Sequence, residues 1–243
     1  DLINANKKVV DGKALYPRMY GDDGWYAYAP GPWSEGALEC YFWTLQPHDH
    51  ARVAGNSWIA YLDGKNPGFP ESALRGDLAT IRQKVAGMRE DETTPDTRLA
   101  DDPMKFNPAT VGTLRQLMMA GLDPGRGAAP LHCRLRYFDP LRRRAGVPED
   151  VAALIDQMTD SQVRVTLVNT NQLVARRVVV QTGAYGEHQC RRVTLGDQAT
   201  AVDGTAFTVV LAPGAGAQLT IETDRYVNQP TLVFPWDRWM IGK

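Results

Sequence analysis

The chain has 243 residues, of which 43% are hydrophobic, and a net charge of −1 at pH 7. This composition supports a hydrophobic core and excludes an intrinsically disordered chain. The balanced charge argues against nucleic acid as the main partner, because binding to phosphates requires a basic excess. No apolar run approaches the roughly 20 residues of a membrane span.

The sequence contains three cysteines, Cys40, Cys133 and Cys190, which cannot all pair within the chain. This odd number argues against a disulfide scaffold and leaves the compartment open; a soluble protein is expected, and a secreted or periplasmic one is compatible. Cys40 lies in an apolar run and is expected to be a small buried hydrophobe. The chain starts at Asp1 without a signal-like segment, which is typical of a processed chain or of one piece of a longer polypeptide.

Residues 1–30 are rich in glycine, aspartate and aromatic side chains, and we expect them to be irregular. The sequence then predicts a buried helix over Trp33–Leu45. Gly31 is its expected N-cap and Pro32 its first residue, because a proline there loses no hydrogen bond. Residues 46–51 predict a polar break after this helix.

Residues 57–62 predict a short buried segment that ends at the Asp63-Gly64 turn. The clearest helix of the sequence follows, because apolar side chains recur at the spacing of one helical face. These side chains are Leu74, Leu78, Ile81, Val85 and Met88. Arginine recurs every seven residues on a neighbouring face, at Arg75, Arg82 and Arg89. A further helix is expected to begin at Asn107-Pro108 and to end at Gly121.

The second half of the chain is dominated by short alternating segments that predict strands. They cover residues 131–138, 163–167, 176–182, 189–195, 207–211, 218–222 and 231–234. One helix is expected among them at about residues 148–158, with Val151, Leu154, Ile155 and Met158 on its buried face. The sequence therefore predicts an α+β fold: a helical region over residues 1–125, then an antiparallel β-sandwich over residues 126–243.

The best-placed acidic side chains lie among aromatic ones near the N-terminus. Glu35 and Glu39 share one face of the predicted helix, and Asp22 and Asp23 belong to the loop before it. The aromatic side chains are those of Trp25, Tyr26, Tyr28 and Trp33. Cleavage of a glycosidic bond uses two carboxyl groups roughly 5–9.5 Å apart. An ordinary helix start, whose dipole favours acids, has the same composition.

The motif His48-Asp49-His50 is a second candidate. In an extended segment both imidazoles would point the same way and could bind a metal, or one could shuttle protons. No third ligand lies close in the sequence, and the dipole favours histidine near a helix C-terminus in any case. A polar loop is the simpler interpretation.

Two further groups of residues have plain structural interpretations. His132-Cys133 and His188-x-Cys190 lie on predicted strands without the close spacing of zinc motifs, and adjacent residues of a strand point to opposite faces. We therefore predict neither a metal nor another cofactor. A basic group is interpreted as a solvated face or an inter-domain ion-pair network rather than an anion site. Its members are Arg134, Arg136, Arg142, Arg143 and Arg144.

Three sequence segments resemble segments of known enzymes: Gly31-Pro-Trp-Ser-Glu-Gly36, Val165-Thr-Leu-Val-Asn-Thr170 and Phe207-Thr-Val-Val-Leu-Ala-Pro-Gly214. With its helices followed by strands, the chain resembles the C-terminal part of carbohydrate-active enzymes that combine an α/α toroid with a β-sandwich. Glycoside hydrolases and polysaccharide lyases share this architecture. The resemblance implies a saccharide or another small polar substrate. Because a complete toroid needs more helices than are predicted here, it also implies a partner chain or a missing N-terminal segment.

The resemblance also implies roles for the candidate residues. In a hydrolase, which we favour, Glu35 is the general acid or base and Asp22 or Asp23 is its partner. The surrounding side chains form the substrate platform: Trp25, Tyr26, Tyr28, Trp33 and Glu39. In a lyase, Tyr26 or His48 is the base instead, and Arg18 neutralises a uronate.

Two other functions stay open. The chain could be a non-catalytic binding or assembly subunit that completes a larger partner, in a homo- or hetero-oligomer. It could also be a small-molecule lyase or isomerase that uses acid–base chemistry in an aromatic pocket of a helical toroid.

Overall fold

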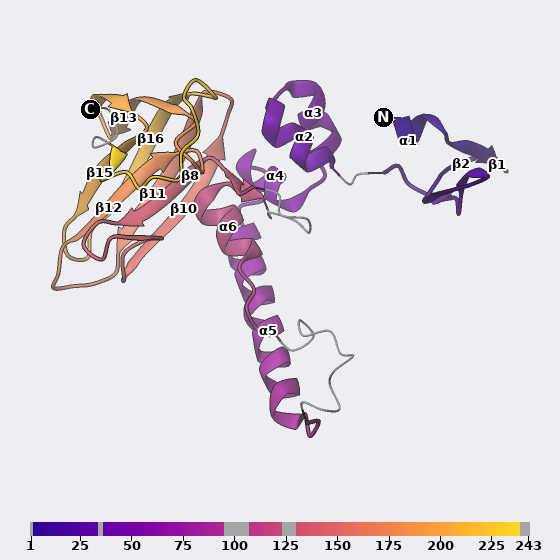
Figure 1. Cartoon of the computed structure of the whole chain (residues 1–243), viewed down its shortest axis with the longest axis horizontal. Coiled ribbons are helices and arrows are strands. Elements are labelled where there is room, and N and C mark those ends of the chain that lie inside the picture. The colour runs from indigo at the N-terminus through magenta and orange to yellow at the C-terminus, as the bar shows by residue number, and fades with distance from the viewer. Residues whose placement is uncertain (1, 34–35, 95–106, 123–129, 239–243) are drawn as a thin grey trace. The chain divides into compact units, whose positions relative to one another are not determined.

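The computed structural model describes residues 2–33, 36–94, 107–122 and 130–238 (Figure 1). The chain divides into two compact units, Asp1–Gly55 and Asn56–Lys243. Helices and strands are both abundant and every described strand pair is antiparallel, so the predicted mixed α+β class is confirmed. Within the described residues, no helix is long and apolar enough to cross a membrane.

The first unit contains regular structure where an irregular segment was expected. A short helix, α1 (Leu2–Ala5), precedes a three-stranded sheet in the order β1-β2-β5 and a separate β3–β4 hairpin. The strands are β1 (Lys8–Val10), β2 (Lys13–Tyr16), β3 (Met19–Gly21), β4 (Gly24–Tyr26) and β5 (Ala29–Pro30). The expectation of an irregular segment was wrong because these strands are too short to show a clear alternation.

Helices α2 (Ala37–Thr44) and α3 (Pro47–Val53) correct two further predictions. Helix α2 begins at Ala37 behind the N-cap Gly36, which has a φ of 77°, so the predicted start at Gly31-Pro32 is wrong. Cys40 is exposed, not buried, because only Tyr41 and Phe42 of this helix are enclosed. The predicted polar break is helix α3, which Pro47 can begin without losing a hydrogen bond.

The second unit begins with three helices: α4 (Ser57–Leu62), α5 (Phe69–Glu90) and α6 (Gly112–Met119). The side chain of Asn56 accepts hydrogen bonds from the N–H groups of Trp58 and Ile59 and so caps α4, which buries the predicted apolar segment. Both α4 and α6 contact strand β10. The division between the two units therefore differs from the boundary predicted at residue 125.

The remaining strands form two large antiparallel sheets. One has the order β10-β11-β16-β13-β14, with β10 (Val151–Met158), β11 (Gln162–Asn169), β16 (Gly216–Asp224), β13 (Gln189–Leu195) and β14 (Gln198–Gly204). The other has the order β15-β12-β8-β9, with β15 (Ala206–Leu211), β12 (Arg176–Thr182), β8 (Leu135–Asp139) and β9 (Arg144–Ala145). A small pair, β6 (Gly121–Leu122) with β7 (His132–Cys133), follows α6.

The predicted helix at residues 148–158 is strand β10. Its residues alternate between buried and more exposed, and Val151, Ala153 and Ile155 lie on the buried side. A register shift between Ile155 and Gln157 brings Met158 back to this side. A short apolar run fits both periodicities, and pairing with β11 decides in favour of the strand.

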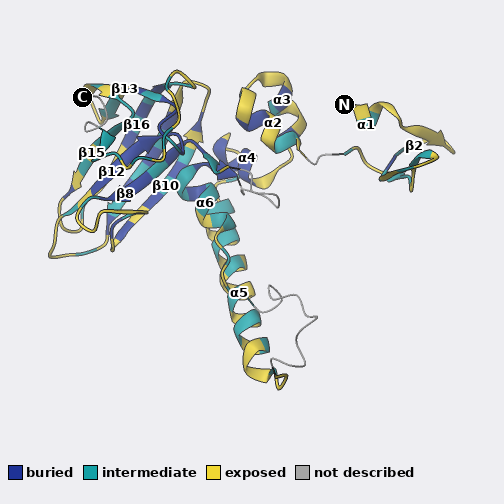
Figure 2. Cartoon of the chain, in the orientation of Figure 1, coloured by how far each residue is buried: buried dark blue, intermediate teal, exposed yellow. Residues whose placement is uncertain are grey.

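The core of the second unit lies along the buried faces of its sheets (Figure 2). The last predicted strand, residues 231–234, has no regular structure. Its Phe234 instead stacks on Trp236 with 5.0 Å between ring centroids. Both rings meet Phe138 edge-on, which fastens this segment to β8 by aromatic packing.

Candidate functional site

The predicted acids Asp22 and Asp23 form the turn of the β3–β4 hairpin, and both are exposed. Across the hairpin, the ring of Trp25 packs edge-on against Tyr20 with 4.9 Å between centroids. Tyr26, at the end of β4, is 48% exposed. The structure therefore brings two predicted acids and two predicted aromatic side chains onto one hairpin.

Arg18 and Trp33 hold the chain between the hairpin and α2. Nη2 of Arg18 donates hydrogen bonds to the carbonyl oxygens of Pro30 and Gly31, both at 2.7 Å. The guanidinium lies 5.8 Å from the ring of Trp33, whose backbone N–H donates to the Asn4 side chain at 2.7 Å. Arg18 thus binds backbone carbonyls, and its predicted role toward a uronate stays a prediction.

The remaining predicted acidic and aromatic residues are Glu35, Glu39 and Tyr28. Glu35 lies outside the described residues. Glu39 is exposed on α2, and Tyr28 lies under the ammonium group of Lys8, 4.2 Å from the ring centre. The two hairpin aspartates and Glu39 form no hydrogen bond or ion pair with any residue that the structure describes. The predicted pair of carboxyl groups therefore stays a prediction.

The motif His48-Asp49-His50 lies in helix α3, not in an extended segment. Residues two positions apart on a helix point roughly 200° apart, so its two imidazoles cannot share a metal. The buried Asp49 carboxylate accepts a hydrogen bond from Thr44 Oγ1 at 2.6 Å and lies 3.2 Å from His48 Nε2. The described part of the chain contains no group of three metal-ligating side chains.

A different set of residues meets at the end of β16, and we call it the Tyr226 cluster: Tyr226, His132, His188, Arg134 and Arg225. Tyr226 has a φ of 56°, a left-handed conformation that costs a bulky residue about 1–3 kcal/mol. Its backbone N–H donates a hydrogen bond to Nδ1 of His188 at 3.1 Å, and the two rings meet edge-on. Its hydroxyl lies 3.0 Å from Nε2 of His132.

Burial, assisted by the positive charges of the Tyr226 cluster, lowers the pKa of both imidazoles and keeps them neutral. Burial lowers the pKa of His132 to about 4, with a further contribution from the cations Arg225 and Arg134. Burial, then Arg134 and Arg225, lower the pKa of His188 to about 3. Arg134 is buried and donates to Thr223 Oγ1 at 3.2 Å. The cluster therefore combines a tyrosine hydroxyl, a neutral imidazole and positive charge, which suits proton transfer on an anionic ligand.

Neighbouring polar groups fix the cluster in place. The Glu187 carboxylate accepts hydrogen bonds from the N–H groups of Ala184 and Tyr185, at 3.1 and 2.8 Å. Its Oε1 lies 4.0 Å from Nε2 of His188. The loop that carries His188 is thereby held by a buried carboxylate, and His188 in turn holds the strained backbone of Tyr226.

From the sequence, both histidines of this cluster were considered as zinc ligands or as partners of a cysteine nucleophile, and both roles were rejected. The structure does bring His132 and His188 to one tyrosine, but Cys133 is completely buried and its thiol has a pKa raised by that burial. The Cys190 thiol contacts the carbonyl oxygen of Arg192. No sequence pattern marked Tyr226 as a candidate site residue, because residue types do not reveal a left-handed backbone at a tyrosine.

The predicted basic group separates into different roles. Nη1 of Arg136 donates to the carbonyl oxygen of Ala184 at 2.8 Å. Each of its three consecutive arginines has an acidic partner: Arg142 with Glu149, Arg143 with Asp237 and Arg144 with Asp139. These three arginines therefore form ion pairs. All three acids follow residue 126, so the pairs do not join the two predicted domains.

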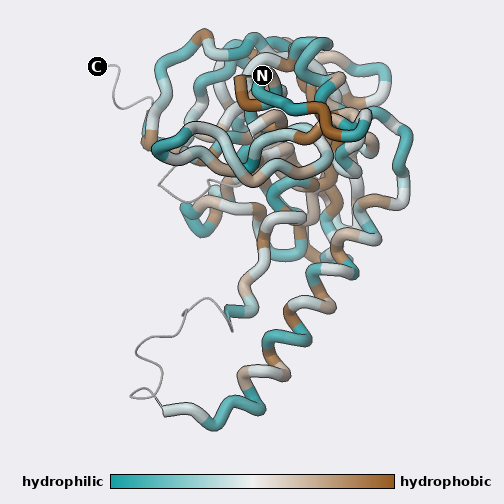
Figure 3. The backbone as a smooth tube through the Cα atoms, turned by 90° about the vertical axis from the view of Figure 1, so that its right-hand side faces the viewer, coloured by the Kyte–Doolittle hydropathy of each residue, from teal (hydrophilic) through white to brown (hydrophobic). Residues whose placement is uncertain are grey.

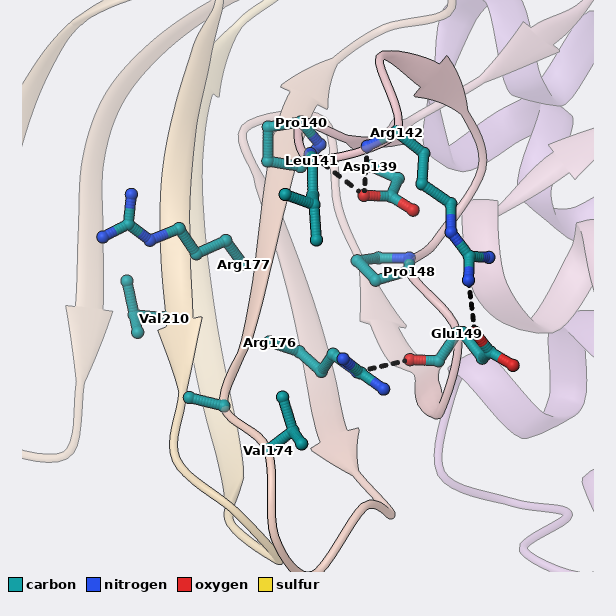
Figure 4. A pocket seen from close by; sticks show the side chains of 11 residues that line it. Asp139, Pro140, Leu141, Arg142, Pro148, Glu149, Val174, Arg176, Arg177 and Val210 are labelled. Atoms are coloured by element: carbon teal, nitrogen blue, oxygen red, sulfur yellow. Dashed lines mark hydrogen bonds and ion pairs between the residues drawn. The ribbon is translucent and has the colours of Figure 1, made fainter.

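A groove of about 540 Å³ lies beside the first residues of β12 (Figure 4). Arg176 crosses it, donating to the carbonyl oxygen of Glu149 at 3.0 Å and to the Asp150 carboxylate at 2.7 Å. Its rim is apolar, with Leu141 87% exposed and Val174 nearby. Two of its three arginines, Arg142 and Arg176, are paired with acids, and Arg177 is exposed. Its described lining includes no histidine or tyrosine, so the Tyr226 cluster is the better candidate for proton transfer.

Comparison with known proteins assigns only part of the chain. A family model described as a domain of unknown function, DUF8034, matches residues 50–115. No curated protein and no solved structure matches the chain. The matched range covers the end of α3, all of α4 and α5 and the first half of α6, and it does not include the Tyr226 cluster.

Proposed function

We propose that this chain is part of a carbohydrate-active enzyme that acts on an acidic saccharide by proton transfer at Tyr226. One observation carries the proposal: the hydroxyl of a tyrosine in a strained backbone lies 3.0 Å from an imidazole that burial, and then two arginines, keep neutral. Strained residues of this kind concentrate at functional sites. The positive surroundings favour a substrate that carries a carboxylate.

The chemistry that fits these groups is β-elimination at a uronate. The Tyr226 hydroxyl first gives its proton to water, and the resulting phenolate then removes the proton from the carbon next to the substrate carboxylate. The electron pair left on that carbon forms a double bond to the neighbouring carbon, whose glycosidic oxygen leaves. The tyrosine returns its proton to that leaving oxygen, so the atoms balance without a cofactor. Arg225, whose guanidinium lies 5.0 Å from the Tyr226 ring, supplies positive charge beside the substrate carboxylate in this proposal.

His132 has a positioning role in this scheme. An imidazole with a pKa of about 4 is a weak base at neutral pH, so His132 does not accept the proton of the Tyr226 hydroxyl. It shares a hydrogen bond with the Tyr226 hydroxyl instead, which fixes the position of that hydroxyl. We further propose that the two large sheets form a β-sandwich and that the helices belong to an α/α toroid, as in the enzymes that the chain resembles.

The test measures turnover of polyuronates, such as polygalacturonate and alginate, through the ultraviolet absorbance of the unsaturated product. We expect Tyr226→Phe to lower kcat by about 10²–10⁴, the usual contribution of general acid–base catalysis. Tyr16→Phe is the matched control, because Tyr16 lies in β2 of the first unit. Circular dichroism checks that both variants fold. A fully active Tyr226→Phe enzyme would remove Tyr226 from the mechanism.

A hydrolase would form a different product from a lyase. It would use Glu35 with Asp22 or Asp23 and would release new reducing ends without a double bond. If Glu35→Gln abolishes turnover while Tyr226→Phe leaves it intact, the hydrolase replaces the lyase. A chain without turnover on acidic or neutral polysaccharides would favour the non-catalytic subunit.

A further inference from the structure

Helix α5 carries an apolar stripe whose members are half-buried or exposed and none of which is buried. The stripe follows an alternating spacing of four and three residues, and its members are Leu74, Leu78, Ile81, Val85 and Met88. No residue of this 22-residue helix is buried (Figure 2). Leu78 is 50% exposed and Met88 is 51% exposed, and apolar bands recur along the helix in Figure 3. Over about two heptads, this spacing matches the a and d positions of a coiled-coil seam.

The two flanks of the stripe differ. On one flank, Nζ of Lys84 donates a hydrogen bond to the carbonyl oxygen of Asn107 at 2.9 Å, and one carboxylate oxygen of Asp77 is enclosed. Helix α6 also contacts α5. The chain therefore covers part of this flank with its own residues 107–119.

The other flank carries the three arginines of the seven-residue repeat, Arg75, Arg82 and Arg89, and all three are exposed. Arg75 pairs with Glu71 of the same helix at 2.7 Å, with both side chains more than 70% exposed. Arg82 and Arg89 form no ion pair with a described residue. Leu78 and Val85 lie next to this flank, so exposed apolar surface and positive charge coincide.

This charge pattern discriminates between partners. In a coiled coil the flanking residues of one helix meet flanking residues of the other. A second copy in antiparallel orientation would place the arginine flank against itself. A parallel copy would pair Asp77 with Arg82 but would also oppose Lys84 and Arg89. A helix with acidic flanking residues meets no such repulsion.

We infer that α5 is a docking surface for an amphipathic helix of a partner protein whose flanking positions are acidic. The partner's apolar residues would cover the stripe beside Leu78 and Val85, and its carboxylates would pair with Arg82 and Arg89. The inference rests on α5 alone and is independent of the proposed chemistry at Tyr226.

The test uses a labelled synthetic helix of about 21 residues, three heptads, with leucine at the seam and glutamate at the flanking positions. Its binding to the full chain is measured by fluorescence anisotropy at low and high salt. A second peptide carries lysine in place of each glutamate. We expect the acidic peptide to bind roughly tenfold more tightly, and the difference to shrink at high salt.

Variants of α5 test the contacts directly. R82E with R89E should reverse the preference between the two peptides, whereas R177E, an exposed arginine on β12, should leave it unchanged. L78S should weaken the binding of both peptides equally. Equal binding of the two peptides, or binding of neither, would overturn the inference. Sedimentation that shows a dimer abolished by L78S would assign the surface to a second copy instead and would also overturn it.

Discussion

Strand β11 and helix α5 have equally regular apolar patterns, but only the pattern of β11 is covered. In β11, Val163, Val165 and Leu167 are completely buried between regularly paired neighbours. In α5, none of the stripe residues is buried. The comparison shows that periodicity determines which face of an element is apolar, whereas burial depends on a second element that the local sequence does not specify.

The largest difference between the two regions is expected from truncating one leucine in each. Leu167→Ala removes a buried side chain and should lower the free energy of unfolding by about 2–5 kcal/mol. Leu78→Ala should lower it by less than about 1 kcal/mol, because the side chain is half exposed and alanine favours helices. Urea unfolding of both variants measures the contrast. Equal losses would mean that α5 is packed in the folded chain.

The effect of acid through histidine should fall on the β-rich region, because α5 contains no histidine. The pKa values of His132 and His188 are about 4 and about 3 in the folded chain, below the ordinary value of 6.5. Their contribution to stability is therefore complete above pH 6.5 and is lost as the pH falls toward these values. Each tenfold loss of proton affinity on folding corresponds to at most about 1.4 kcal/mol of this contribution. His132 is less buried than His188, so solvent screening reduces its share further.

Urea midpoints measured between pH 7 and pH 4 check this acid dependence. His188→Gln should make the dependence shallower, because one of the two titrating groups is removed. A urea midpoint that stays constant as the pH falls below 6.5 would contradict the neutral, buried state of these imidazoles.

The smallest expected effects come from one ion pair in each region. Arg164 and Asp156 join β11 to β10 at 2.7 Å with partly covered side chains, so Asp156→Asn should cost about 0.5–1 kcal/mol. Glu71 and Arg75 on α5 are both more than 70% exposed, so Glu71→Gln should cost no more than about 0.5 kcal/mol. Thermal unfolding of the two variants ranks these losses. The reverse order would show that the ion pair on α5 contributes more to stability than the ion pair between β10 and β11.

Long regular patterns were predictable from the sequence, as α5, β11 and β12 show. Short ones were not. Strand β10 is an apolar run that suits a helix and a strand equally, and only its pairing with β11 decides. Helix α3 has the composition of a polar loop, but it buries Asp49 and Val53. In both cases the deciding contact lies outside the segment.

The candidate site was less predictable than the fold. His132 and His188 were identified as notable residues, but their common contact with Tyr226 depends on the pairing of strands far apart in the sequence. The neutral state of the two imidazoles depends on the same folding, because burial and two arginines produce it. The role of Arg18, which binds two backbone carbonyls, likewise depends on a turn that residue types do not reveal.

The position of β16 has a consequence for how the chain is made. In the five-stranded sheet, β16 lies between β11 and β13, although it is the last of the five strands in the sequence. During synthesis, β10 can pair with β11, and β13 can pair with β14, before β16 is made. The edges of β11 and β13 that later pair with β16 are then unpaired. The two halves can join only after the last strand has emerged. This sheet therefore closes after synthesis of its final strand, and its two open edges need protection from other chains until then.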